Sequence, residues 1–435
     1  MTSFRQIPLA LLLLLPIGGR GEGQDESENK SVTLSPAKLY RSKDESILPG
    51  KLEVPPDGGS TLPLLSRVMP VVEGSVGSGV SERFLLDTAC SATVLSPSQV
   101  ARWELPIRVL PDKAFLGFFG SITVNRCARL DRLALGNALA RDVDAVLCEL
   151  SHLHFFSGIA GVSILSQCPL LLDGGQGEAR FLPVESLAEI LATLYPEAHW
   201  SKLSLYWDGG CPSVKLDAGD LFSGDRILRM IVDTGASSSG LQPATVRELG
   251  LQALRKEAVL YADVFGTHQH ELDVFRLERM RLGNWICDLE TSRSHSPSLA
   301  TEHMDGVLGF DLLGQVPCVF DAPGGMLWVL DPPAGAQAVL RSSGDSAGIA
   351  WFQDPLPDVR KWAAESVARI GRRRHLPHVA ALLKDEDPEV QEAAAAALST
   401  FAQETWPQAS RLQDARAWWE KHKGDPEFQP QAKNH

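Results

Sequence analysis

An internal duplication constrains this chain more than any other feature. Residues 87–91 (DTACS) and 233–237 (DTGAS) lie 146 residues apart, and each follows a short apolar run. Further landmarks repeat in the same order at offsets of 146 to 148 residues: Pro97 and Pro243, Gly120 and Gly266, Gly136 and Gly283, Gly161 and Gly309. A single shared tripeptide arises by chance, but an ordered series at one offset does not. The chain therefore contains two copies of one lobe.

Both copies have a sequence pattern typical of β-strands, with short apolar runs bounded by Gly, Pro and Ser. Residues 84–86 and 231–232 run directly into the acidic loops, which indicates a buried strand ending in a tight turn. Two related lobes pack around a pseudo-twofold axis, which puts equivalent segments next to each other. We therefore expect Asp87 and Asp233 to meet between the lobes.

The paired loops resemble the two catalytic loops of pepsin-like and retropepsin-like aspartic proteases, over roughly residues 61–333. The apolar-apolar-Gly segments that end at Gly161 and Gly309 also match this family, and residues 310–313 continue as in the retroviral type. The resemblance implies a mainly β, bilobal acid-protease fold. It also implies that Asp87 and Asp233 are the catalytic residues and that a polypeptide is the substrate.

The same resemblance assigns supporting roles around the two aspartates. Thr88 and Thr234 would cross-brace the loops with hydrogen bonds, and Gly235 would offer a backbone amide close to the carboxylates. The supporting loop residues are Thr88, Ala89, Cys90, Thr234, Gly235 and Ala236. The residues expected to pack beneath the loops are Ile159, Gly161, Val307 and Gly309.

The expected chemistry needs only the two carboxyl groups. Like charges this close cannot both ionise easily, so the pair shares one proton. The ionised group takes a proton from an attacking water, and the protonated group donates to the scissile carbonyl oxygen. We expect no metal and no cofactor. The closely spaced pairs His152/His154 and His268/His270 are interpreted as solvated loop residues.

The first loop departs from the family pattern. Ala89 stands where the second loop has Gly235, and its Cβ would crowd the loop or tilt Asp87. Cys90 is expected to be a free, buried thiol that donates weakly to Asp87. Ser163 stands where the second lobe has Asp311. Three interpretations stay open: an active endopeptidase, a catalytically weak protease fold used as a binding module, or a scaffold that acts through its C-terminal repeats.

The hydrophobic period becomes helical after residue 353. Residues 357–364 resemble residues 388–395 at an offset of 31. This pattern is similar to HEAT-type repeats, in which helix pairs stack to bury a shared core, and it implies a protein partner. Residues 334–348 are rich in Gly, Ala and Ser, which predicts a linker over residues 334–353. A chain ending near Pro333 is therefore expected to fold and to cleave small peptides.

The N-terminus predicts export. Arg5 precedes an apolar run over residues 7–17, followed by small residues, as in a secretory signal peptide. The run is too short for a membrane span, so we expect a secreted or periplasmic protein with no span in the mature chain. The net charge of −13 and the absence of a basic stripe argue against nucleic-acid binding.

The seven cysteines include no compact CxxC pair, which argues against a zinc site and a dense disulfide framework. One or two disulfides stay open. The predicted organisation is a signal peptide (1–23), a flexible linker (24–60), protease lobes (61–202 and 203–333), a second linker (334–353), HEAT-like repeats (354–424) and a tail (425–435).

Overall fold

The computed structural model describes residues 15–16, 47–56, 59–77, 79–117, 120–150, 153, 155–208, 210–218, 226–263, 266–292, 304–333, 339–342, 349–370, 373–425 and 428. Most of the predicted signal peptide and first linker lies outside these residues. The described parts include β1 (Leu15–Pro16), which pairs with β7 (Ile107–Gly117), and residues 47–56 of the linker. His152, His154 and the side chains of His268 and His270 also lie outside the described residues.

The first lobe is a twisted antiparallel sheet with two short parallel pairings. Its strand order is β1-β7-β8-β4-β5-β10-β6-β9-β2. The strands are β2 (Lys51–Glu53), β4 (Val71–Val76), β5 (Val80–Leu86), β6 (Thr93–Leu95), β7 (Ile107–Gly117), β8 (Gly120–Leu135), β9 (Ala138–Leu147) and β10 (Gly158–Ala160), and the helices are α2 (Pro97–Arg102) and α3 (Val162–Leu165).

The second lobe repeats this arrangement. The main path of its sheet is β17-β21-β16-β15-β19-β20-β24. Its strands are β14 (Tyr206–Asp208), β15 (Cys211–Asp217), β16 (Ile227–Val232), β17 (Gly240–Leu241), β18 (Arg255–Asp263), β19 (Gly266–Leu282), β20 (Trp285–Ser292), β21 (Gly306–Leu308) and β24 (Val339–Ser342), and its helices are α5 (Pro243–Glu248) and α6 (Phe310–Leu313). In both lobes a helix begins at the repeated proline, Pro97 in α2 and Pro243 in α5.

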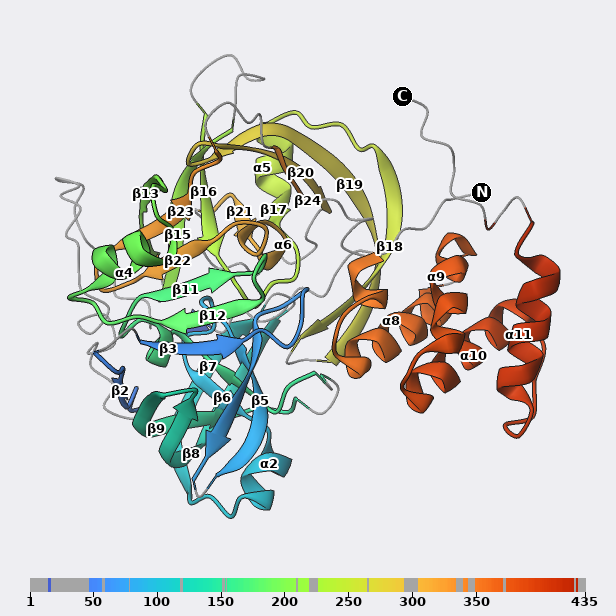
Figure 1. Ribbon diagram of the computed structural model, residues 1–435, viewed down its shortest axis with the longest axis horizontal. Coiled ribbons are helices and arrows are strands. Elements are labelled where there is room, and N and C mark those ends of the chain that lie inside the picture. The colour runs from blue at the N-terminus through green and yellow to red at the C-terminus, as the bar shows by residue number, and fades with distance from the viewer. Residues whose placement is uncertain are drawn as a thin grey trace.

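A third sheet joins the lobes and lies between them in Figure 1, with strand order β13-β23-β22-β11-β12-β3. Its strands are β3 (Ser60–Pro63), β11 (Leu170–Asp173), β12 (Glu178–Phe181), β13 (Trp200–Ser204), β22 (Cys318–Asp321) and β23 (Met326–Leu330). The equivalent strands β11 and β22 pair antiparallel, with Leu171 opposite Val319, so the pseudo-twofold axis passes between them. Helix α4 (Leu187–Leu194) covers this sheet through Leu187 and Leu191.

The C-terminal helices form an array beside the lobes (Figure 1). They are α8 (Pro357–Ile370), α9 (Leu376–Ala381), α10 (Pro388–Ala402) and α11 (Arg411–His422), with short 3₁₀ turns η1 (Arg373–His375) and η2 (Leu382–Lys384). Pro388 occupies the first turn of α10, and the Asp387 side chain caps it by accepting from the amides of Glu389 and Val390. Among the described residues, no helix combines the length and hydropathy of a transmembrane segment.

The predicted fold class is confirmed: a mainly β, two-lobed molecule is followed by a small helical repeat array. Both predicted linkers, however, contain ordered edge strands. Lys51–Glu53 form β2 on β9, and Val339–Ser342 form β24 on β20. Edge pairing is made by backbone groups, which side-chain composition does not report.

The second linker also differs from its predicted boundary. Trp351 and Phe352, placed at its end, are buried in the contact between the helices and the first lobe. The lobes and the array are therefore in contact through a shared buried cluster.

Candidate active site

Each aspartate follows a central strand that has a parallel neighbour. β5 pairs with β10, with Leu85 opposite Ile159, and β16 pairs with β21, with Ile231 opposite Val307. The Asp87 amide donates to the Ala160 carbonyl and the Asp233 amide donates to the Leu308 carbonyl, both at 3.0 Å. The two aspartates therefore leave their sheets at equivalent points, with Ile159 and Val307 on the neighbouring strands.

The two acidic loops are joined by reciprocal threonine hydrogen bonds. The Thr88 amide donates to Thr234 Oγ1 and the Thr234 amide donates to Thr88 Oγ1, each at 3.1 Å. Each hydroxyl in turn donates across the lobe boundary, from Thr88 to the Val232 carbonyl at 2.7 Å and from Thr234 to the Leu86 carbonyl at 2.6 Å. Four buried hydrogen bonds thus fix one loop against the other.

Two glycines make room for these loops. A Cβ at Gly161 would overlap the carbonyl oxygens of Cys90 and Ala92. A Cβ at Gly309 would lie 2.8 Å from the Ala236 carbonyl oxygen, which already accepts a hydrogen bond from the Phe310 amide at 2.7 Å. The sequence pattern that ends in Gly is therefore a packing requirement of the acidic loop above it.

The threonine bonds hold the Asp87 and Asp233 loops against each other, and each carboxyl group influences the pKa of the other. Oδ1 of Asp87 accepts from the amides of Ala89 and Cys90 at 2.9 Å, and Oδ1 of Asp233 accepts from the Ala236 amide at 2.9 Å. Both side chains are buried, with 0% and 1% of their surface exposed. In each loop one oxygen is held by backbone amides, while Oδ2 of Asp87 receives no hydrogen bond from them.

Burial raises the pKa of both carboxyl groups, because the charged form loses its hydration. The loop amides act in the opposite direction at both sites. The charge of Asp87 raises the pKa of Asp233 further. The pair therefore favours a state with one shared proton.

Gly235 and Ala89 occupy equivalent positions with different surroundings. A Cβ at Gly235 would fall 2.5 Å from Cγ of Asp87, so only Gly fits there. Ala89 is accommodated in a small apolar cluster with Cys211, Ile231, Ala236, Met304 and Val307. Oδ1 of Asp87 accepts hydrogen bonds from the backbone amides of its loop, as Oδ1 of Asp233 does. The methyl group of Ala89 therefore does not displace Asp87.

Cys90 is free and fully buried, as expected. Its thiol donates to the Ala92 carbonyl at 3.1 Å, so the expected donation to Asp87 is wrong; it is the Cys90 amide that contacts Asp87. Burial raises the pKa of the Cys90 thiol well above its usual value, which keeps it protonated.

A further pair of supporting side chains was missed. Ser239 donates to Asp311 Oδ1 at 2.7 Å and accepts from the Gly309 amide at 2.9 Å. In the first lobe Thr93 contacts Ser163 at 3.1 Å in the same way. Thr93 and Ser239 are 146 residues apart, so the constant offset was the signal that could have found them.

Each lobe has a long antiparallel hairpin at the corresponding place. β7 pairs with β8 and β18 pairs with β19, each in antiparallel register up to its turn. Phe118, Phe119 and Phe265, at the turns of these hairpins, lie outside the described residues. Within the described ranges, no group of His, Cys, Asp and Glu side chains is arranged to hold a metal ion.

Comparisons with known proteins follow the same division of the chain. Residues 72–164 and 221–312 match the aspartyl protease family, and residues 348–417 match HEAT repeats. No curated protein matches the chain significantly. The crystal structure of the aspartic proteinase from Irpex lacteus is similar over 64% of this chain and 98% of its own, with 13% sequence identity and a TM-score of 0.36.

Each family match to the lobes contains one Asp loop and the glycine beneath it, and the match to HEAT repeats contains α8 and α10. The resemblance drawn from the duplicated loops and the 31-residue helical offset is thereby confirmed. The chain is similar to aspartyl proteases in each of its two lobes and to HEAT-repeat proteins in its C-terminal helices.

Proposed function

We propose that this protein is an aspartic-type endopeptidase that hydrolyses peptide bonds with a water activated between Asp87 and Asp233. The observation that carries the proposal is the threonine brace, whose four buried hydrogen bonds hold the two Asp loops against each other across the lobe boundary. Both carboxyl groups are buried there, and the charge of one raises the pKa of the other. Two neighbouring carboxyl groups that share one proton supply an acid and a base in one site.

The proposed roles belong to the singly protonated pair. The ionised carboxylate takes the proton from the attacking water, and the protonated carboxyl group donates its proton to the oxygen of the scissile carbonyl. After attack, the proton gained by the carboxylate passes to the leaving amine. The pair titrates as a unit, so these roles describe its singly protonated state.

The test is hydrolysis of a mixed peptide library by the wild-type protein and by Asp87→Asn and Asp233→Asn, between pH 4 and pH 8. Each amide variant is expected to reduce kcat at least about 1,000-fold, because an amide cannot act as the base or share the proton. Asp131→Asn, on the exposed part of β8, is the matched control and is expected to be fully active. Substantial cleavage by either folded dyad variant would contradict the proposal.

A catalytically weak binding module is the second candidate, and the full burial of the dyad favours it. A statine-type mimic of the tetrahedral intermediate separates the two. An active enzyme is expected to bind it much more tightly than the matching peptide, because catalysis requires complementarity to the transition state. Equal affinity, with no cleavage of the peptide, supports the binding module.

We also propose that the protein is exported to the periplasm or the exterior. The proposal rests on Arg5, the apolar run over residues 7–17 and the small residues that follow. Mass spectrometry of the protein from its native host is expected to find a mature N-terminus near residue 24. An intact Met1 in the mature protein would contradict the proposal.

A further inference from the structure

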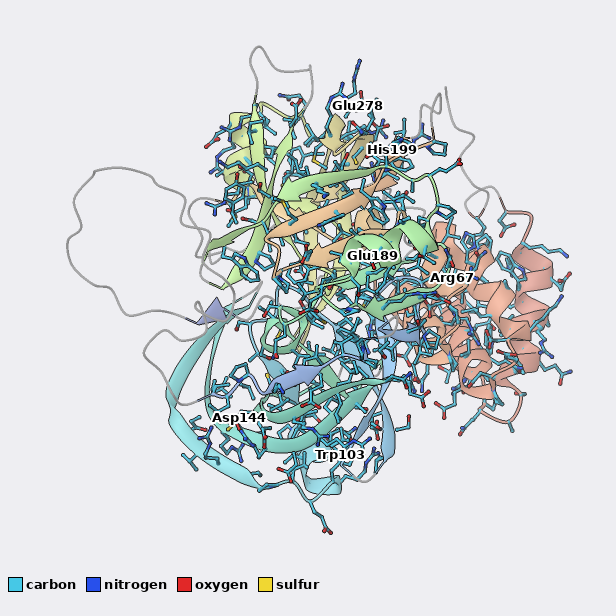
Figure 2. All side chains as sticks on the ribbon, turned by 60° about the vertical axis from the view of Figure 1, so that its left-hand side comes forward. Arg67, Trp103, Asp144, Glu189, His199 and Glu278 are labelled. Carbon is cyan, nitrogen blue, oxygen red and sulfur yellow. The ribbon has the colours of Figure 1, made fainter. Side chains whose placement is uncertain are left out.

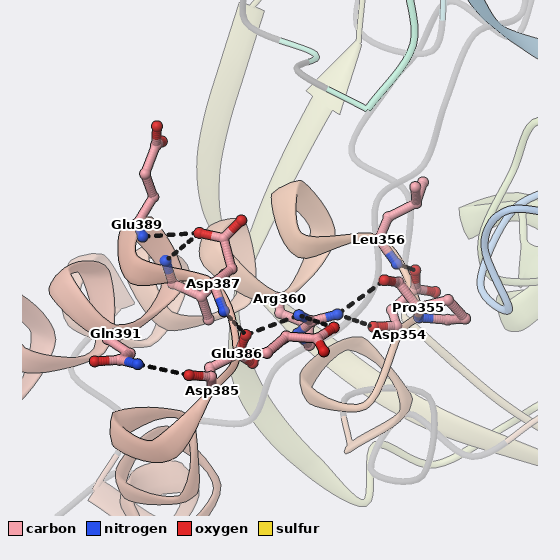
Figure 3. A network of polar contacts seen from close by, with 10 residues as sticks. Asp354, Pro355, Leu356, Arg360, Asp385, Glu386, Asp387, Glu389 and Gln391 are labelled. Carbon is pink, nitrogen blue, oxygen red and sulfur yellow. Dashed lines mark hydrogen bonds and ion pairs between the residues drawn. The ribbon is translucent and has the colours of Figure 1, made fainter.

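The HEAT-like array is anchored to the first lobe by a buried carboxylate. Asp354, of which 1% is exposed, accepts at Oδ2 from the Ser66 hydroxyl and from the Arg67 amide, both at 2.8 Å. Figure 2 places Arg67 where the first lobe meets the helices. On the other side, Arg360 donates to the Asp354 carbonyl at 2.8 Å and forms a two-pronged pair with Asp385 (Figure 3). Asp354 thus links the lobe to the helical network.

Aromatic side chains surround this anchor. Phe155 of the first lobe lies edge-on to Trp351 and Trp362, with ring centroids 6.1 and 6.0 Å away, and the two Trp rings are 4.9 Å apart. These rings belong to one buried apolar cluster that continues under the Asp87 loop as Leu85, Cys90, Ala92 and Ile159. The layer beneath the first acidic loop and the core of the helical array are therefore continuous.

The backbone bonded to Asp354 leads directly to Asp87. Residues 66–70 run into β4, where Val71 pairs with Leu85. The Leu86 amide donates to the Pro70 carbonyl at 3.0 Å. The Asp354 carboxylate is thus connected to Leu86, the residue before Asp87, in three steps. These are a hydrogen bond from the Arg67 amide, the chain from Arg67 to Pro70, and the hydrogen bond from the Leu86 amide to the Pro70 carbonyl.

The second lobe has no such support among the described residues. Ile231 and Val307, the equivalents of Leu85 and Ile159, lie in a cluster of six residues that contains no helix of the array. Helix α8 meets the second lobe elsewhere, at strand β18 (Figure 1). Every residue of α8 from Pro357 to Ala368 is buried or half-buried, as expected for a helix packed on more than one side.

We propose that Asp354, with the Trp351–Trp362 pair, positions the Asp87 loop, so that the HEAT-like array is a built-in support for one half of the dyad. The catalytic consequence rests on the proposed function, whereas the structural coupling does not. The support fixes the geometry of the reacting groups and does not contribute to substrate binding. Its loss therefore lowers kcat and leaves KM nearly unchanged.

The experiment compares full-length Asp354→Ala with wild type by hydrogen exchange and by peptide hydrolysis. Exchange of amides in residues 84–92 is expected to rise at least about tenfold, whereas residues 230–238 exchange as in wild type. The kcat is expected to fall about tenfold, with KM changed by less than about twofold. Asp354→Asn, which keeps an oxygen that can accept from Ser66 and Arg67, is expected to restore both values to within about twofold of wild type.

Asp387→Ala is the matched control, because it removes the cap of α10 and loosens the array without touching the first lobe. It is expected to leave residues 84–92 and kcat unchanged. If Asp354→Ala does not fold, Phe155→Leu removes the aromatic contact from the lobe side and is read in the same way. The inference is overturned if exchange at 84–92 does not change, or if Asp387→Ala changes it equally. A wild-type protein that cleaves nothing overturns the proposed function alone, since exchange still decides the coupling.

Discussion

At the scale of single residues, the packing of the two Asp loops depends on which positions have room for a Cβ. The two loops have nearly the same sequence and the same hydrogen bonds, yet Gly235 faces the Asp87 carboxyl whereas Ala89 faces apolar side chains. One methyl group is therefore tolerated in the first loop and excluded from the second. This asymmetry makes the two equivalent positions a matched pair for mutagenesis.

Gly235→Ala is expected to reduce cleavage at least about tenfold and to lower stability by about 1–3 kcal/mol, because the new Cβ would fall 2.5 Å from Cγ of Asp87. Ala89→Gly is expected to fold and to remain active. Peptide hydrolysis and urea unfolding measure the two effects. A fully active Gly235→Ala would show that the Asp87 carboxyl is not held in the described position.

The buried dyad also makes stability depend on pH. Burial raises the pKa of Asp87 from 3.8 to about 7, so the folded state binds a proton more tightly than the unfolded chain does. This contribution is fully present below about pH 4 and is lost as the pH rises through about 7. Asp87→Asn is therefore expected to have a higher Tm than wild type at pH 8 and a similar Tm at pH 4.

Calorimetry at both pH values measures this difference, and Asp131→Asn controls for the loss of one surface charge. A Tm of Asp87→Asn below that of wild type at pH 8 would show that the carboxylate is stabilised in the folded protein, contrary to its burial.

At the scale of elements, the helical array depends on one buried ion pair. Arg360 donates to Asp385 from Nε at 2.7 Å and from Nη2 at 2.8 Å, and its Nη1 reaches the carbonyls of Asp354 and Pro355 (Figure 3). It therefore links α8 to the turn before α10. The next residue, Lys361, pairs with Glu389 at 2.7 Å on the surface.

Arg360→Met is expected to destabilise the array by about 3–5 kcal/mol, since it leaves the Asp385 carboxylate buried without its partner. Lys361→Met removes a neighbouring surface pair and is expected to change stability by less than about 1 kcal/mol. Urea unfolding followed by Trp fluorescence measures both. Equal effects of the two variants would show that the buried pair contributes no more to the free energy of unfolding than the surface pair does.

At the scale of the whole molecule, the lobes and the array share a core. Met69, Leu85 and Phe155 of the first lobe and Trp351 and Val359 of the array belong to one buried cluster. Arg83 also pairs with Asp358 at 2.7 Å at its edge. Removing the array would expose this apolar surface and leave Ser66 without its acceptor.

A chain ending at Pro333 is therefore expected to aggregate or to unfold at a Tm well below that of the full chain. This replaces the expectation from sequence that the lobes fold alone. Size-exclusion chromatography and calorimetry of the two proteins measure the difference. A monomeric truncated protein with the Tm of the full chain would show that the shared cluster does not stabilise the lobes.

The sequence by itself determined the duplication, the two-lobed fold and the repeat array, because each is a periodic pattern of residue types along the chain. It also located Asp87, Asp233 and their threonines through equivalent positions in two copies.

Only the tertiary structure decided how Ala89 fits, where the Cys90 thiol points and that Asp354 reaches Ser66. These contacts join residues without a shared period or offset: Ser66 and Asp354 are 288 positions apart and belong to different domains. Which buried surfaces meet depends on the shapes of folded units, and no local pattern records that shape.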